Sequence, residues 1–371
     1  MNIFHKSQKY KFYYFLLILI VILVIEISLN LIYKIQNKSF LFERVATPTF
    51  VEDDWCCYKT KPNLNYIHSN PEFITEINTD NNGNRIAYEK VKIDPNKKNI
   101  LILGPSISFG QGVNYEDSYS FKLQESFSNY NFQNGSIPGH PPELNLCWYF
   151  KNNINYKPDI VIQNIYDSHM LNIPNINNID ELCKSICKKI DIEVTKEGYL
   201  KNKGNIYLNI RATLKKSSII FYTWYFYEQY IFKTKKDKKF INKRIGKEFY
   251  GDQELNEKKI INEYKKYEKL FEKINPGIKV YFVLIPTSFT VSDRYAHRYN
   301  LRAGDTAEHR ERYKYFSNIM ENNFNTINVY KALEKKDTKK QTYYNIDVHF
   351  TKYGNQVVFE TLKDYFEKKI N

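Results

Sequence analysis

A short apolar run that stops at a glycine, a proline and a serine constrains the fold of this chain most strongly. Residues 100–103 read Ile-Leu-Ile-Leu, and Gly104, Pro105 and Ser106 follow directly. A continuous apolar run of this length is typical of a strand buried on both faces, as in a parallel sheet. The sequence therefore predicts a central strand whose carboxyl end presents Ser106.

Strand and helix patterns alternate after this run. Further apolar stretches predict strands near residues 129–134, 158–167, 278–288 and 325–333. Between and after them, apolar side chains recur at helical spacing over residues 117–130, 143–154 and 351–370, with Asp117 or Ser118 as the candidate cap of the first helix. Such alternation is typical of an α/β fold with a parallel sheet.

The N-terminal segment is long and apolar enough to cross a membrane. Residues 12–33 contain a single charged side chain, Glu26, which together with Asn30 weakens the second half of the segment. No small-residue cleavage site follows, so we expect an uncleaved signal anchor rather than a removed signal peptide. The basic residues on its two sides nearly balance, and the amino group favours residues 1–11 in the cytoplasm, with the rest of the chain outside.

The remaining chain divides into a connecting region, residues 34–93, and a folded domain, residues 94–371. A basic and aromatic helical insertion is expected around residues 170–275; within it, residues 213–249 carry ten Lys or Arg against three acids. This insertion could lie on a membrane interface, or its aromatic side chains could pack on the sheet with its lysines solvated. The formal charge of +14 for 371 residues fits a solvated basic surface or an anionic partner.

The five cysteines define neither a metal site nor a disulfide framework. None of them has the paired spacing of a zinc ligand set, and Cys183 and Cys187 are one helical turn apart, which favours packing over a mutual disulfide. The redox compartment therefore cannot be read from the cysteines. No metal and no organic cofactor is predicted.

The serine that ends the central strand needs a base before it can act as a nucleophile. Of the seven histidines, only His349 has an acid two residues before it, Asp347, and a helix just after it. The carboxylate can accept a hydrogen bond from one ring nitrogen while the other nitrogen faces Ser106. Taken singly, Ser106 could equally cap a helix and His349 could simply begin one.

Four segments together resemble the blocks of the SGNH (GDSL-like) hydrolase and acyl esterase family, in the right order over about residues 75–371. They are "ILILGPSISFGQG", "NGSIPGH", "PDIVIQNIYDSH" and "YYNIDVHFTKYGNQ", and "NTDNNGNRI" upstream is similar to the lead-in of membrane-anchored members. The resemblance implies a flavodoxin-like three-layer α/β/α fold with a central parallel sheet. It also implies Ser106 as nucleophile, His349 as base and Asp347 as the partner that orients it.

The resemblance further implies an oxyanion site that is altered in this chain. The backbone N–H of Ser106 would be one donor, and Pro105, which stands where the family has Asp or Gly, leaves that donor intact. Ser136 replaces the family's glycine, with a backbone N–H that can still donate, and Ser168 replaces its asparagine. Both serines could instead be structural or vestigial. His140 and His169 are expected near the mouth of the pocket.

The sequence thus predicts a membrane-anchored, SGNH-type serine ester hydrolase or O-acyltransferase. Its substrates would be acylated glycans or lipid-linked sugars outside the cytoplasm, and its mechanism would pass through an acyl-Ser106 intermediate without a cofactor. The alternative is a catalytically silent protein of the same fold that binds a glycan or an assembly partner, as the replacements at Ser136 and Ser168 suggest. Nucleic acid is not an expected partner, because an exported domain rarely meets it.

Overall fold

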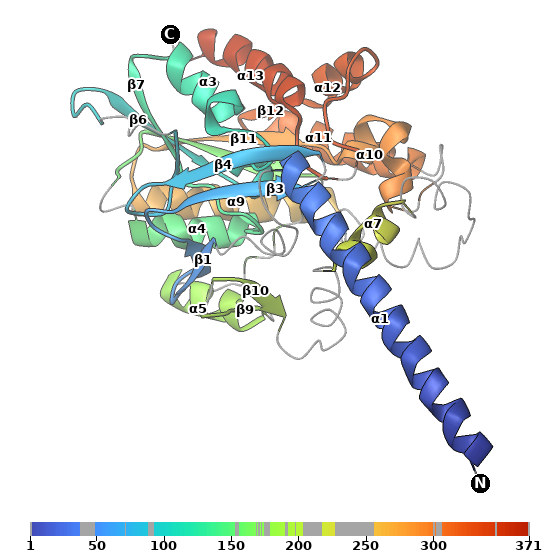
Figure 1. The fold of residues 1–371 in the computed structure, drawn as a ribbon. Helices are drawn as coiled ribbons and strands as arrows, with labels where there is room; N and C mark the ends of the chain where they lie inside the picture. Colours follow the sequence, from blue (N-terminus) through green and yellow to red (C-terminus); the bar gives the residue numbers. More distant parts are fainter. Residues whose placement is uncertain are drawn as a thin grey trace.

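A computed structural model gives the three-dimensional structure of the chain (Figure 1). The residues it describes are 2–37, 49–70, 72–87, 93–152, 156–167, 169, 171, 173, 179–189, 192–196, 198–202, 217–226, 256–299, 301, 306–345 and 347–369. Every structural statement below concerns these residues.

A five-stranded parallel sheet forms the centre of the molecule. Its spatial order is β7-β6-β8-β11-β12, and the strands are β6 (Lys98–Leu103), β7 (Tyr130–Asn134), β8 (Ile160–Tyr166), β11 (Lys279–Ile285) and β12 (Thr326–Asn328). Numbered along the chain, this order is 2-1-3-4-5, the flavodoxin-like arrangement that the sequence analysis expected. The chain passes from β6 to its neighbour β7 on one side and then crosses to β8 on the other side of β6. The switch point of the sheet therefore lies between β6 and β8.

Three antiparallel strands extend this sheet beyond β7. They are β5 (Arg85–Ile86), β4 (Phe73–Thr79) and β3 (Asn65–Asn70), and they come from the region that the sequence analysis treated as a connection. Along β4, buried and exposed side chains alternate, as in a strand with one solvated face. Glu72, which directly precedes β4, matters for the site described below.

Helices cover both faces of the sheet, which gives the three layers (Figure 1). Two neighbouring residues of β11 point to opposite faces: the ring of Tyr281 lies 5.4 Å from Phe366, and the ring of Phe282 lies 5.3 Å from Tyr264. The helices are α2 (Ser106–Phe109), α3 (Tyr119–Ser126), α4 (Pro142–Asn152), α5 (Ile179–Lys189), α9 (Glu257–Ile274), α10 (Ser288–Val291), α11 (Ala307–Asn323), α12 (Tyr330–Asp337) and α13 (Lys352–Glu367), with 3₁₀ turns η1 (Tyr115–Asp117) and η5 (Asp293–Tyr299).

Most expected elements are confirmed with small shifts. Ser118 caps α3 by accepting a hydrogen bond from the N–H of Phe121, and Thr351 caps α13 through Gly354. The fifth strand is shorter than predicted, since the chain turns at Val329 and residues 330–337 form α12. Residues 330–333 of the predicted strand are therefore helical, and the buried Leu333 packs inward from that helix.

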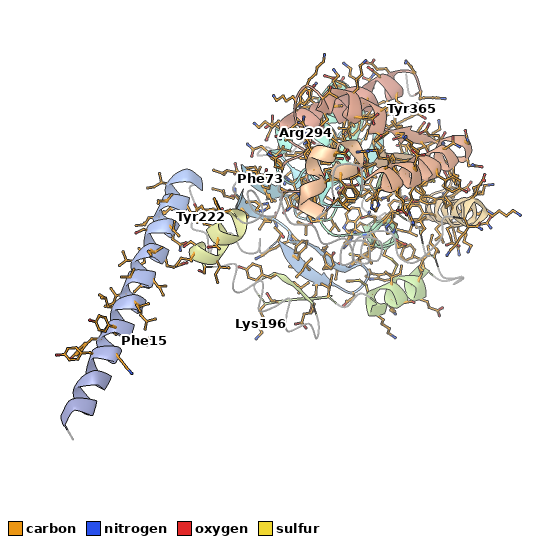
Figure 2. All side chains as sticks on the ribbon, turned by 90° about the vertical axis from the view of Figure 1, so that its right-hand side faces the viewer. Phe15, Phe73, Lys196, Tyr222, Arg294 and Tyr365 are labelled. Atoms are coloured by element: carbon orange, nitrogen blue, oxygen red, sulfur yellow. A yellow bond between two sulfur atoms is a disulfide. The ribbon has the colours of Figure 1, made fainter. Side chains whose placement is uncertain are left out.

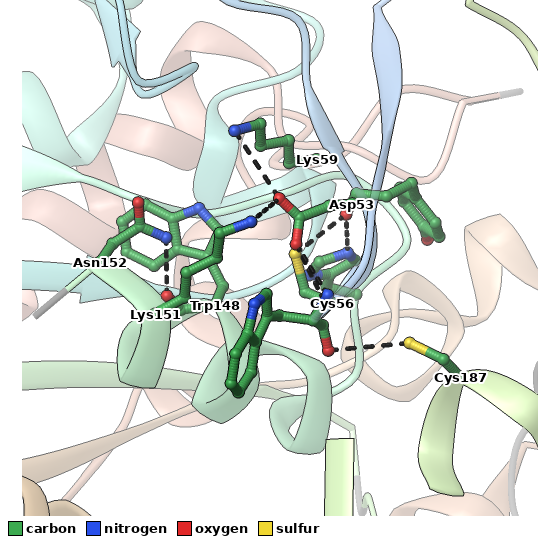
Figure 3. A network of polar contacts seen from close by, with 10 residues as sticks. Asp53, Cys56, Lys59, Trp148, Lys151, Asn152 and Cys187 are labelled. Carbon is green, nitrogen blue, oxygen red and sulfur yellow. Dashed lines mark hydrogen bonds and ion pairs between the residues drawn. The ribbon is translucent and has the colours of Figure 1, made fainter. Parts of the chain in front are cut away.

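A small hairpin, β1 (Phe50–Asp53) and β2 (Cys57–Thr60), is fastened to the helical layer by a buried carboxylate (Figure 3). Asp53 pairs with Lys151 of α4 at 2.9 Å and with Lys59 at 3.7 Å, and it accepts the N–H groups of Trp55 and Cys56. Burial alone would raise the pKa of Asp53, but these partners outweigh it and hold the pKa below its usual value.

Two disulfides join this region to α5, which corrects the expectation that the cysteines define no framework. Cys57 is bonded to Cys187 and Cys147 to Cys183, while Cys56 remains a buried thiol. Cys183 and Cys187 share one face of α5, as their spacing predicted, yet each meets a distant partner. The sequence could not reveal these pairings because they depend on where α5 docks. A short β-ribbon, β9 (Ile192–Val194) and β10 (Leu200–Asn202), follows α5.

The N-terminal helix α1 (Asn2–Asn37) projects away from the domain (Figures 1 and 2). By length and composition its segment Tyr13–Ile35 can cross a membrane, and none of its most apolar window is buried in the protein. A short apolar helix from the predicted insertion, α7 (Ser218–Phe226), lies against it. Most of the basic part of the insertion, residues 227–249, falls outside the described residues.

Candidate active site

The central strand β6 ends at Gly104, and Ser106 begins the helical turn α2. Gly104 has to be a glycine here, because a Cβ atom would lie 2.4 Å from the hydroxyl of Ser108 and 2.8 Å from the Cβ of Asn164 on β8. This close packing draws the chain tightly across the sheet edge. It leaves Ser106 partly exposed at the carboxyl end of β6, next to the switch point of the sheet.

The loop before α13 presents the base and the acid. Its two ends are joined, since Thr351 donates to the carbonyl of Thr342 at 2.9 Å and Tyr344 donates to that of His349 at 3.1 Å. Two tyrosine hydroxyls tie the loop to the sheet edge: Tyr343 reaches the carbonyl of Pro286 after β11, and Tyr344 reaches that of Gly112 after α2. The loop is thus anchored on both sides of the switch point.

These two segments bring Ser106, His349 and Asp347 into one hydrogen-bonded chain. The Nε2 atom of His349 lies 2.7 Å from the Oγ of Ser106, and its Nδ1 contacts the Oδ1 of Asp347. Asp347 also accepts the backbone N–H of His349 at 3.1 Å, so the carboxylate fixes the ring from two sides. This geometry allows the imidazole to take the proton of Ser106 while its protonated form is stabilised by the carboxylate.

Glu72, in the turn between β3 and β4, holds the same loop. Its two carboxylate oxygens accept the backbone N–H groups of Asn345 and Asp347, each at 2.7 Å. Sequence reasoning missed this residue, because 275 positions separate it from Asp347 and nothing near it resembles a motif. The only local feature that could have drawn attention to Glu72 is its position as an acid next to a proline, between two strand-like segments.

Arg85 supports the serine turn from behind. It is 1% exposed, it donates to the carbonyl oxygens of Glu76 and Val113, and its guanidinium lies 5.0 Å from the centre of the Phe109 ring. Burial lowers the pKa of Arg85 to about 10, so the side chain stays charged at neutral pH. This arginine belongs to the "NTDNNGNRI" segment, which the sequence analysis had noted only as a similar lead-in.

The structure does not leave the N–H of Ser136 available as an oxyanion donor. That N–H donates to the side chain of Asn134 at 3.1 Å, and the flanking N–H groups of Gly135 and Ile137 donate to the carbonyls of Ile102 and Gly104. The Ser136 side chain is fully buried, and its hydroxyl has no hydrogen-bond partner among the described residues. In this structure the N–H of Ser136 is thus engaged, and a role for Ser136 at the oxyanion site stays a prediction.

Three other residues were predicted near the pocket: Ser168, His140 and His169. Ser168 lies outside the described residues. His140 is enclosed and contacts the carbonyl of Tyr58, and burial lowers its pKa to about 3, so it is a neutral structural side chain rather than a group at a pocket mouth. His169 is partly exposed and pairs with Glu143 at 3.2 Å; burial opposes its charge, but the carboxylate prevails and raises its pKa.

Within the described part of the chain, no cluster of His, Cys, Asp or Glu side chains could hold a metal ion. The chemistry that this site offers is that of a serine, an imidazole and a carboxylate in series.

No protein-family model matches the chain, and no curated protein matches its sequence. Solved structures with a weak likeness to the chain include TesA, with 12% identity over 73% of this chain and 99% of that one, at a TM-score of 0.37. A lipolytic protein of the G-D-S-L family from Veillonella parvula is 12% identical over 73% of this chain and 98% of that one, at a TM-score of 0.37. The psychrotrophic esterase EstA from Pseudoalteromonas sp. is 13% identical over 74% of this chain and 100% of that one, at a TM-score of 0.36.

Proposed function

We propose that this chain is a membrane-anchored serine ester hydrolase or O-acyltransferase of the SGNH type. The observation that carries the proposal is the 2.7 Å contact between the Ser106 hydroxyl and His349, whose other ring nitrogen is held by Asp347. In the proposed reaction, His349 takes the hydroxyl proton as Ser106 attacks the ester carbonyl carbon. The same proton then passes to the departing alkoxide, which leaves an acyl group on Ser106.

Water or a sugar hydroxyl would then attack the acyl-enzyme, with His349 again taking the proton. The oxyanion donor that we assign is the N–H of Ser106, which opens α2 and so has no acceptor in a preceding turn of that helix. With Ser136 engaged elsewhere, fewer donors reach the oxyanion than in the family pattern. We therefore expect slow turnover on simple esters.

The proposed substrates are acylated glycans or lipid-linked sugars outside the cytoplasm. The anchor Tyr13–Ile35 supports a site close to a membrane, and the two disulfides support an oxidising compartment. Both agree with a domain on the outer side of the membrane.

A phosphonate that reacts only with activated serines tests the proposal on the full-length protein. We expect a fluorophosphonate probe to label wild type, and to label Ser106→Ala and His349→Ala at least about 10³-fold more slowly. The matched control is Ser108→Ala, a buried serine on the same turn, which should be labelled as wild type is.

The competing function is a silent binding protein of the same fold, which the occupied N–H of Ser136 favours. Absence of labelling in folded wild-type protein, or equal labelling of wild type and Ser106→Ala, would reject the enzyme in favour of this alternative.

A further inference from the structure

The contact between α7 and the N-terminal helix gives a role to the two polar residues that interrupt the apolar span. Glu26 accepts the backbone N–H groups of Ser218 at 2.6 Å and of Ile219 at 2.9 Å, and also the hydroxyl of Ser217. Asn30 donates to the hydroxyl of Ser218 at 2.7 Å. The carboxylate of α1 thus sits on the first turn of α7, where a helix has N–H groups without partners.

These contacts lie within the depth of the membrane span. Glu26 precedes Ile35, the last residue of the span, by about 13 Å of helix axis at ~1.5 Å per residue. A carboxylate in such a place needs donors, and a helix N-terminus there needs acceptors, because lipid offers neither. The carboxylate of Glu26 accepts the free N–H groups of the first turn of α7, so each group supplies the hydrogen-bond partners that the other needs.

The two helices stay together as α7 runs on toward the domain end of α1. The ring of Tyr222, in the second turn of α7, meets the ring of Tyr33 edge-on at 6.5 Å, and Tyr33 is only 1% exposed (Figure 2). Hence α7 rises from the depth of Glu26 toward the surface of the membrane. Tyr222 therefore packs on α1, whereas one interpretation of the sequence placed the aromatic residues of the insertion on the sheet.

The described side chains that α7 exposes are Ile220, Thr223 and Phe226, and two of these three are large and apolar. Ile220 and Phe226 are 38% and 54% exposed, beside a span whose own side chains are exposed along its length. In sequence, lysines follow this aromatic stretch at residues 233, 235 and 236, on the side toward which α7 rises. Aromatic side chains followed by lysines suit the boundary between hydrocarbon and anionic headgroups.

We propose that residues 217–226 form a second membrane-embedded element: a short helix that docks on the signal anchor through Glu26, rises along it to the membrane surface and exposes its own apolar side chains to lipid. The proposal goes beyond the catalytic function and rests only on α1 lying in a bilayer. Docked in this way, α7 gives the domain a second attachment and limits its rotation about the anchor.

Trp224 of α7 provides a direct test in the full-length chain. The protein is reconstituted into phosphatidylcholine vesicles containing phosphatidylglycerol, with bromine on the upper part of the acyl chains. We expect brominated lipid to quench part of the tryptophan emission, and Trp224→Phe to abolish this quenching, because Trp55 and Trp148 lie in the domain. Equal quenching of wild type and Trp224→Phe would overturn the proposal.

Cysteine pairs test the docking itself. The Asn30→Cys, Ser218→Cys double variant should form a disulfide in vesicles and keep one alkylatable thiol per chain, that of Cys56. The control pair Leu19→Cys, Ser218→Cys, about 16 Å away along α1, should show three. Adding Glu26→Leu to the first pair should at least halve the disulfide yield. Three thiols in the first pair would contradict the docking, whatever the protein does to esters.

Discussion

Asp347 and His349 lie two residues apart, yet the base reaches Ser106 only through contacts from distant segments. Glu72 holds the backbone of the loop, Tyr344 ties it to Gly112, and Arg85 supports the turn of the serine. A nucleophile and its base must stay within hydrogen-bond reach during the reaction, and small misplacements are costly. At the residue scale, the proposed site therefore includes the residues that position Ser106, His349 and Asp347 as well as these three side chains.

Glu72→Gln tests the positioning role. Glutamine keeps one acceptor oxygen but presents an amide group to the second backbone N–H, so one charge-assisted hydrogen bond worth about 1.5–3 kcal/mol is lost. We expect kcat for ester hydrolysis to fall about tenfold or more, with KM changed less than about twofold. Glu76→Gln, an exposed acid on the adjoining strand β4, is the matched control. A rise in KM alone would contradict positioning.

Ser136→Ala should preserve activity and slightly stabilise the protein. The buried hydroxyl has no hydrogen-bond partner among the described residues, and such a group costs about 1–3 kcal/mol. We expect a higher Tm by thermal unfolding, and phosphonate labelling within about threefold of wild type. A loss of about 10²-fold in turnover at unchanged Tm would instead identify the Ser136 hydroxyl as an oxyanion donor, because alanine keeps the backbone N–H.

At the scale of elements, the hairpin β1–β2 and helix α5 are held to α4 by covalent bonds and by one buried carboxylate. The bridges Cys57–Cys187 and Cys147–Cys183 span 130 and 36 positions of the chain. Closing such long loops stabilises a fold mainly by restricting the unfolded state. Asp53 adds an ionic attachment to Lys151 inside the same region.

Alkylation of the denatured, unreduced chain should modify one cysteine, and of the reduced chain all five. Cys56 is the expected single thiol; burial raises its pKa well above the usual value, so in the native protein it should resist alkylation. Cys187→Ser should lower stability by roughly 2–5 kcal/mol, seen as a lower Tm, whereas Cys56→Ala should leave both bridges in place. Five reactive thiols without reductant would refute the pairings.

The stability that Asp53 contributes should disappear in acid. Because its folded pKa is lowered, the contribution is present above the unfolded value of about 3.9, and it is lost as the pH falls from there through the folded value. Urea unfolding should find Asp53→Asn less stable than wild type at pH 7, with the difference shrinking below about pH 4. Asp54→Asn, an exposed neighbour, should show no such pH dependence.

At the scale of the whole molecule, the helix α1 projects from the α/β domain and the apolar helix α7 lies against it. The basic residues on the two sides of α1 nearly balance, so their charges alone barely favour one orientation of the helix. The two disulfides favour an oxidising compartment for the domain. We expect added protease to remove the domain from right-side-out membrane vesicles and to spare it in inverted ones. The reverse pattern would place the domain in the cytoplasm and remove exported glycans from the proposed substrates.

The sequence by itself determined the layers and which three side chains, those of Ser106, His349 and Asp347, come together at the proposed site. Continuous apolar runs such as residues 100–103 predicted buried parallel strands, because whether a strand is buried on one face or both shows in the order of its own residues. The D-x-H spacing and the serine after a strand likewise identified residues that the structure brings together, since Asp347 and His349 are near neighbours and Ser106 ends the central strand.

Only the tertiary structure decided what depends on docking. The support from Glu72, the partners of Cys183 and Cys187, and the occupied N–H of Ser136 all join segments far apart in the chain or depend on side-chain orientation. The same holds for Glu26, which in the sequence only weakens an apolar span and in the structure holds the first turn of α7. Local patterns record whether a side chain is buried; they do not record its partner, because that choice is made when the elements pack together.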